Sequence, residues 1–135
     1  MDSNVGKAII ATLAGLLCIA CTSSVAKGKA AAQYPAVLHG AWLGEGRDYC
    51  KRADSLDSDS RFEISASKRR GYEDWNEPLS VVQISKDPQA WKVVSTLHIN
   101  EDAMRIEEVF LLSGQDNGAL TIVNRQQAMT YYRCP

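Results

Sequence analysis

The histidines and the clustered acids are the residues whose types could bind a metal or move protons. The only histidines are His39 and His98, and neither has a carboxylate or cysteine at metal-ligand spacing. Zinc needs three or four ligands in a recognisable set, so no zinc site is expected. Calcium needs oxygen ligands at alternate positions, which invites comparison with Asp54, Asp57 and Asp59, but this run lacks the central glycine and closing glutamate of a calcium loop. We expect a solvated loop there.

Catalytic motifs are not visible in the chain. There is no G-x-S-x-G elbow and no phosphate-binding glycine loop. The acid pairs Glu73/Asp74 and Glu107/Glu108 are adjacent in sequence, so on a strand their side chains point to opposite faces. The sequence therefore predicts a protein that is not an enzyme and needs no cofactor.

Two kinds of residue could recognise a partner. Residues 68–70 form a basic turn, which we expect to be solvated. Residues 71–78 are expected to form a loop that combines acids and Pro78 with Tyr72 and Trp75, and these two aromatic types dominate interface energetics. Tyr72 and Trp75 are thus candidates for partner binding, the alternative being that they cover a barrel end.

The N-terminus has the composition of an export signal. A short basic start is followed by an apolar run over residues 8–20 and then by small residues. That run is shorter than the ~20 residues of a membrane span. Two cleavage sites stay open: one before Cys21, which would then be acylated as in a lipoprotein, and one after residue 26. The expected location is the periplasm or, by lipid anchor, the outer membrane, with secretion as the alternative.

The remaining chain has room for one domain. We expect a signal over residues 1–26 (or 1–20), a tether over 27–35 and a domain over 36–135. The chain has 15 basic against 16 acidic side chains. This balance gives no electrostatic reason to expect nucleic-acid binding.

Cysteine usage predicts one disulfide. Of the four cysteines, Cys18 and Cys21 belong to the signal or anchor, which leaves Cys50 and Cys134. An exported protein meets an oxidising compartment, so the two remaining thiols should pair with each other. The spacing is unlike a C-x-x-C redox motif, and we expect a structural bond.

Apolar residues recur mostly with the strand period of two, and turn residues separate the runs. The expected strands cover residues 37–43, 61–66, 79–85, 91–99, 105–113, 119–123 and 129–133. Residues 101–112 could instead form a short helix capped by Asn100, but we favour a strand because the neighbouring runs are strands. Seven or eight strands of this length predict an all-β antiparallel barrel, or alternatively a β-sandwich.

Gly40-Ala41-Trp42 on the first expected strand resembles the G-x-W signature of the calycin barrels, which include lipocalins and bacterial metalloprotease inhibitors. The resemblance implies that Trp42 seals one barrel end and that Arg133 packs across it. The layout, with Gly40 and Trp42 before Cys50 and an ending of Y-Y-R-C, is also similar to small exported proteobacterial proteins of uncharacterised role.

The function expected from these features is non-catalytic binding in the cell envelope. One hypothesis is an inhibitor or immunity-type module that binds a protein partner. The alternatives are a lipocalin-like carrier of a small apolar ligand and a structural envelope lipoprotein.

Overall fold

The computed structural model describes residues 30–135. The expected signal, both cleavage sites and the acylation position Cys21 lie outside the described residues. Within 30–135 no helix is long and apolar enough to cross a bilayer.

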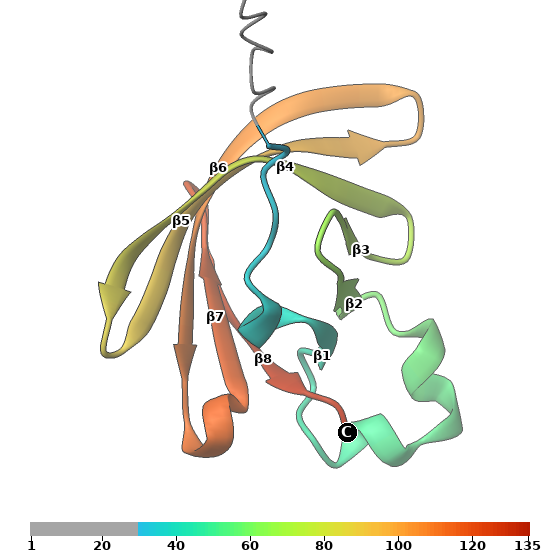
Figure 1. Ribbon diagram of the computed structural model, residues 1–135. Coiled ribbons are helices and arrows are strands. Elements are labelled where there is room, and N and C mark those ends of the chain that lie inside the picture. The colour runs from blue at the N-terminus through green and yellow to red at the C-terminus, as the bar shows by residue number, and fades with distance from the viewer. Residues whose placement is uncertain (1–29) are drawn as a thin grey trace, which may run out of the picture.

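The described chain folds as a closed antiparallel β-barrel in which each strand pairs with the next and β8 returns to β1 (Figure 1). The strands are β1 (Gly40–Leu43), β2 (Arg61–Ile64), β3 (Arg69–Arg70), β4 (Asp74–Lys86), β5 (Gln89–Ile99), β6 (Asp102–Ser113), β7 (Ala119–Val123) and β8 (Ala128–Arg133). Four short 3-10 helices connect them: η1 (Ala36–Leu38), η2 (Tyr49–Lys51), η3 (Ala53–Asp57) and η4 (Gln115–Asn117). The predicted all-β barrel is confirmed, and the sandwich alternative is wrong.

Alternation along the strands builds the core. Every second residue of a strand points inward, so the apolar half of each alternating run is buried while its polar half meets solvent. The buried apolar cluster consists of Tyr34, Leu38, Trp42, Phe62, Ile64, Trp91, Val93, Phe110, Leu112, Leu120 and Ile122. The cluster includes Tyr34 from the segment expected to be a tether, and the Tyr34 N–H donates to the Ala66 carbonyl at 2.8 Å.

Three expected elements differ from the structure. Residues 74–78, expected in a loop, are the start of β4, and β3 (Arg69–Arg70) replaces part of the expected basic turn. Pro78 is tolerated because the register of β4 against β5 shifts between Pro78 and Ser80, where the ladder is interrupted. Residues 36–38 form η1 rather than the start of a strand. The strand expected over 105–113, rather than a helix, is confirmed as β6.

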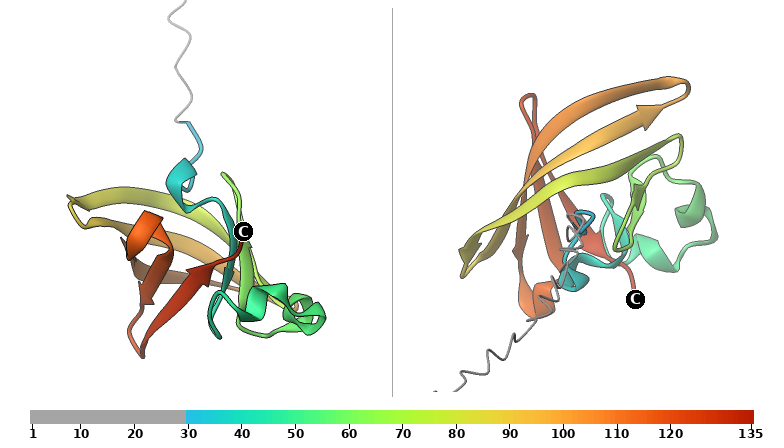
Figure 2. Two further views of the ribbon diagram at one scale, coloured as in Figure 1. Left: turned by 90° about the horizontal axis from the view of Figure 1, so that it is seen from below. Right: turned by 45° about the horizontal axis from the view of Figure 1, so that its top comes forward.

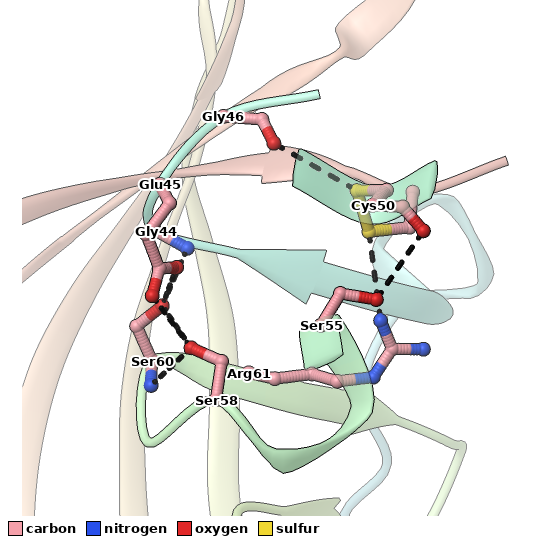
Figure 3. Close-up of a disulfide and its surroundings, with 9 residues drawn as sticks. Gly44, Glu45, Gly46, Cys50, Ser55, Ser58, Ser60 and Arg61 are labelled. Carbon is pink, nitrogen blue, oxygen red and sulfur yellow. Dashed lines mark hydrogen bonds between the residues drawn. A yellow bond between two sulfur atoms is a disulfide. The ribbon is translucent and has the colours of Figure 1, made fainter. Parts of the chain in front are cut away.

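The seam that closes the barrel is one of its short pairings, together with those of β3 to β2 and β4. β1 pairs with β8 through only two residue pairs, Trp42 with Arg133 and Leu43 with Tyr132. The predicted disulfide Cys50–Cys134 lies beside this seam and joins the end of the chain to η2, with a Cα–Cα distance of 5.6 Å (Figure 3). Cys134 N–H also donates to the Ala41 carbonyl at 2.9 Å.

The β4–β5 hairpin and the β5–β6 hairpin extend beyond the rest of the barrel in different directions (Figure 2). The β5–β6 hairpin projects because β7 pairs only with Val109 to Ser113 of β6. Residues 102–108 of β6 therefore pair on one side alone, with β5. This arrangement leaves that end of the barrel open on the side of β6.

Candidate ligand-binding site

Trp42 lies in the interior of the barrel at the seam between β1 and β8. Its indole is fully buried, and its Nε1–H donates to the Leu38 carbonyl at 2.9 Å. The Arg133 guanidinium carbon lies 4.2 Å from the centre of the indole. Arg133 also donates to the carbonyls of His39 at 2.7 Å and Val37 at 2.6 Å. The arginine thereby joins the last strand to η1 across the tryptophan.

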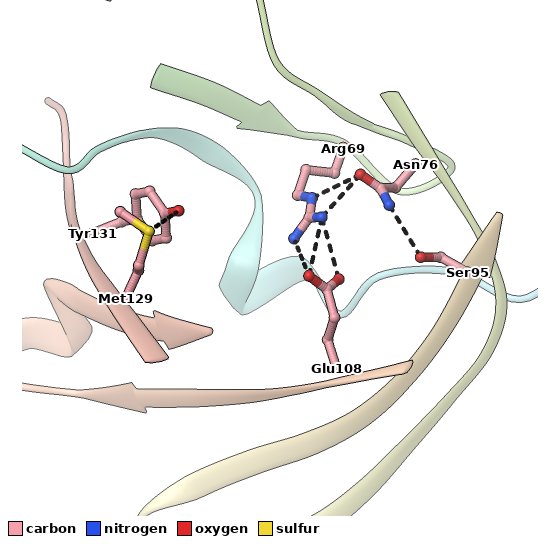
Figure 4. Close-up of polar contacts among 6 residues, drawn as sticks. All are labelled: Arg69, Asn76, Ser95, Glu108, Met129 and Tyr131. Carbon is pink, nitrogen blue, oxygen red and sulfur yellow. Dashed lines mark hydrogen bonds and ion pairs between the residues drawn. The ribbon is translucent and has the colours of Figure 1, made fainter. Parts of the chain in front are cut away.

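Arg69, Asn76, Ser95 and Glu108 form a connected layer of polar contacts in the interior of the barrel (Figure 4). Arg69 donates through Nε and Nη2 to the Asn76 Oδ1 at 3.1 and 2.9 Å. Its Nη1 and Nη2 reach the Glu108 Oε1 at 3.4 and 3.3 Å. Asn76 in turn donates to the Ser95 hydroxyl at 3.2 Å. Side chains from β3, β4, β5 and β6 thus form one hydrogen-bonded group.

The Arg69–Glu108 ion pair is buried. The side chains are 13% and 5% exposed, and the guanidinium carbon lies 5.7 Å from the ring centre of Phe62 and 5.5 Å from that of Phe110. Removing two charges from water is costly, so such a pair is weak evidence for a stabilising role. The buried Arg69–Glu108 pair is therefore a candidate for recognising a ligand.

Two tyrosines near the ion pair, Tyr34 and Tyr131, have pKa values that burial raises. Burial raises the pKa of Tyr34 to about 12; the Glu108 carboxylate adds to this rise, whereas the Arg69 guanidinium opposes it. Burial also raises the pKa of Tyr131, again with Arg69 opposing. Both phenols are therefore neutral hydrogen-bonding groups at physiological pH.

A cavity of about 950 Å³ opens above the polar layer. Arg69 and Glu108 line it, together with apolar side chains of β5 and β6 and the turn between β7 and β8. Leu97 and Ile106 lie on the inward faces of β5 and β6, next to Ser95 and Glu108 in the alternation. Met104, opposite Leu97 in the register, continues this apolar wall to the rim.

The two aromatic residues predicted to bind a partner differ in accessibility. Tyr72 lies in the β3–β4 connection and is 64% exposed. Trp75 lies in β4, is half-buried, and stacks on the His98 ring at 4.8 Å between centres, with Lys68 Nζ 5.5 Å from its own centre. Trp75 therefore already has packing partners on the barrel wall, whereas Tyr72 is free to meet another molecule.

The histidines and the aspartate run have local partners. His39 Nε2 lies 2.9 Å from the Tyr34 carbonyl, and His98 Nε2 lies 3.3 Å from the Glu77 carboxylate. Asp54 accepts two hydrogen bonds from Arg52, which lower its pKa. Within residues 30–135 no three His, Cys, Asp or Glu side chains gather at metal-binding distance.

Sequence reasoning missed Arg69 and Glu108 as site residues. Arg69 was expected in a solvated basic turn, but it points into the barrel and is only 13% exposed. Glu108 shares its strand face with Ile106, Phe110 and Leu112, and an acid on an apolar face was the available signal. Finding its partner required the pairing of β3, which the sequence does not indicate.

The fold and the cavity define the class of molecule: a small up-and-down β-barrel with a buried tryptophan in its core and a cavity lined in part by a buried ion pair. Comparison of the chain with protein-family models, with curated proteins and with solved structures finds no match.

Proposed function

We propose that this protein is a non-catalytic binding protein that holds a small ligand in the cavity at the open end of its barrel. The observation that carries the proposal is the cavity of about 950 Å³, in which an apolar strip of β5 and β6 lies next to the Arg69–Glu108 pair and further charged and polar side chains line the remainder. Small-molecule sites are typically concavities of about 300–1,000 Å³, and the volume of this cavity lies in that range. This corresponds to the carrier alternative expected from the sequence.

The filling of the barrel supports a ligand at the mouth rather than deep inside. Trp91, Phe110 and Leu120 are buried, do not line the cavity and fill the interior below it, as expected for a barrel of eight strands. Leu97, by contrast, is half-buried and faces the cavity. The ligand would therefore rest on the Arg69–Glu108 layer and not penetrate to Trp42.

The polar groups of the cavity floor are bound to one another, which supports binding rather than catalysis. Arg69 and Glu108 bind each other and Asn76, and neither histidine lines the cavity. Such a floor holds and orients a ligand.

Binding of a neutral fluorophore tests the proposal. N-phenyl-naphthylamine should become brighter when the full-length protein is added, because its emission rises in an apolar site. Met104→Asp puts a charge on the cavity wall and should weaken binding by about tenfold, equivalent to about 1.4 kcal/mol. Met104 is 48% exposed, so this change should leave the fold intact.

Val82→Asp is the matched control. Val82 is 54% exposed on β4 and does not line the cavity. The proposal predicts unchanged binding for Val82→Asp. Equal weakening by both variants, or no binding by the unmodified protein, would contradict it.

A second candidate, a module that binds a protein partner, is favoured by the exposed Tyr72. Pull-down from envelope extract with the unmodified protein and with Tyr72→Ala tests it. A partner recovered equally by both forms would remove Tyr72 from the interface.

We also propose that the protein works in the cell envelope. The Cys50–Cys134 bond supports this location, since structural disulfides persist in oxidising compartments. Mass spectrometry of the intact protein purified from its host decides between acylation at Cys21 and cleavage after residue 26. A mass that still includes residues 1–20 would contradict export.

A further inference from the structure

We infer that the ligand of this cavity is a neutral amphipathic molecule, with an apolar body along Leu97, Met104 and Ile106 and an uncharged hydroxyl or amide head at the Arg69–Glu108 pair. The inference rests on the proposed function and goes further by naming the chemistry of the ligand. It separates this ligand from fatty-acid anions and from alkyl amines.

The Arg69–Glu108 pair, which lines the cavity, keeps one donor and one acceptor without a hydrogen-bond partner among residues 30–135. A guanidinium has five N–H groups, and four hydrogen bonds join Arg69 to Asn76 and Glu108, so one N–H is left over. The Glu108 Oε2 lies 3.2 Å from Arg69 Nη2 but receives no hydrogen bond from residues 30–135. A hydroxyl or amide both donates and accepts, and so matches this floor.

The charge balance of the floor disfavours an ionic head. Arg69 and Glu108 together have no net charge, so any ion placed on them leaves one charge uncompensated in a site shielded from water. A carboxylate would gain from Arg69 but be repelled by Glu108, and an ammonium would meet the reverse. A neutral head avoids both costs.

The other charged side chains of the cavity also give it little net charge. Five basic and four acidic side chains line it, so the rim has no strong charge of either sign. At the rim, Glu107 is already paired with Lys92 at 3.1 Å and with Arg105 at 3.7 Å. Neither an anion nor a cation has a field that would draw it in.

The apolar wall sets the other end of the ligand. Leu97 and Ile106 stand on neighbouring strands, and Met104 lies directly across from Leu97. Phe62, Ile122 and Tyr131 complete the wall nearer the floor. Burial of a chain or ring against these side chains supplies the free energy of binding, while the head fixes its direction.

Three ligands with one shared chain test the inference: dodecanol, dodecanoate and dodecylammonium. Each is titrated near neutral pH against N-phenyl-naphthylamine bound to the full-length protein, below the concentration at which it forms micelles. We expect dodecanol to displace the fluorophore at a concentration at least about tenfold lower than either ion.

Glu108→Gln gives the decisive comparison, because an alcohol also leaves water more readily than an ion does. The variant leaves the charge of Arg69 unbalanced, so dodecanoate should gain about tenfold relative to dodecanol. An unchanged order of the three ligands in Glu108→Gln would overturn the inference.

The double variant Arg69→Met/Glu108→Leu covers the case in which Glu108→Gln does not fold, since buried ion pairs are often replaced by apolar residues without loss of stability. Here dodecanol loses its head-group partners and should bind about tenfold more weakly, while the fluorophore is retained. Undiminished binding of dodecanol would overturn the inference. Tighter binding of an ion by the unmodified protein would overturn the inference alone, whereas no binding of any ligand would overturn the proposed function as well.

Discussion

Tyr34 contributes a phenol to the interior whose hydroxyl lies near Ser95 but forms no well-aligned hydrogen bond with any of residues 30–135. The side chain is 2% exposed, and its ring stacks on Phe110 with 6.1 Å between centres. The ring therefore contributes to packing, whereas the buried hydroxyl has lost water without gaining a well-aligned protein partner. An unsatisfied buried hydroxyl costs about 1–3 kcal/mol.

Tyr34→Phe should therefore raise the free energy of unfolding at neutral pH by about 1 kcal/mol, because it removes the hydroxyl and keeps the stacked ring. Urea unfolding followed by tryptophan fluorescence measures the change. A loss of stability larger than about 1 kcal/mol would contradict this account of the hydroxyl.

The raised pKa of Tyr34 makes stability depend on alkaline pH. The phenol titrates at about 12 in the folded protein against 10.0 as its ordinary value, so the unfolded chain loses its proton first. Below pH 10 the phenol keeps its proton in both states, so the free energy of unfolding does not depend on its titration. As pH rises from 10 towards 12 the unfolded chain loses this proton while the folded protein keeps it, and the free energy of unfolding falls. The shift corresponds to about 3 kcal/mol. The difference in stability between the unmodified protein and Tyr34→Phe should change by this amount across the window. A constant difference would show that the phenol is not shifted.

Residue-scale prediction from the sequence succeeded where a residue type has one strong preference. Cys50 and Cys134 could be paired because an exported chain leaves them no other partner. Arg69 could not be placed, since an arginine two residues from a glycine is usually solvated and only the barrel's closure brings it to Glu108. Long-range polar contacts leave no local pattern in the chain.

Gly40 begins β1 in a conformation that favours glycine, with φ of +123°. A side chain added there would lie 3.4 Å from Nη1 of Arg133, the residue that covers Trp42. Gly40→Ala should therefore lower the free energy of unfolding by about 1–3 kcal/mol, the usual cost of a strained backbone. Thermal unfolding followed by circular dichroism measures it.

Gly46→Ala is the control for Gly40→Ala. Gly46 has a φ of +111°, but an added side chain there would meet no atom within 4 Å. The two variants share the backbone cost, so any excess loss in Gly40→Ala reports the contact with Arg133. A Gly40→Ala protein as stable as the unmodified one would contradict the role assigned to this glycine.

At the scale of elements, the period of two located most strands well. The run at 119–123 matches β7, and the run at 91–99 falls within β5. The pattern failed at 74–78, because acids and a proline suggested a loop where pairing with β5 imposes a strand. It failed again at Arg69–Arg70, since two residues are too few for any period to be seen. Tertiary pairing, not local preference, determines these segments.

At the scale of the whole molecule, closure of the barrel could be expected and the shape of its open end could not. The disulfide and the number of strands both indicated a closed sheet. The cavity depends on the unequal lengths of β6 and β7. β6 is the longer strand, and its first residues extend beyond the part that pairs with β7. Strand lengths are the least certain part of a sequence-based assignment, so the mouth becomes visible only in the structure.

The Cys50–Cys134 bond should be the main support of the barrel's seam. It spans 84 residues of sequence, and β1 and β8 share only two residue pairs beside it. The chain-entropy account gives about 4–5 kcal/mol for a loop of this length, usually less in practice. Reduction, or the double variant Cys50→Ser/Cys134→Ser, should lower the free energy of unfolding by about 2–4 kcal/mol. Hydrogen exchange should then accelerate first in β1 and β8, because the bond lies beside these two strands and their own pairing is short. Exchange that accelerates equally in all strands would mean that the bond supports the whole barrel evenly rather than its seam.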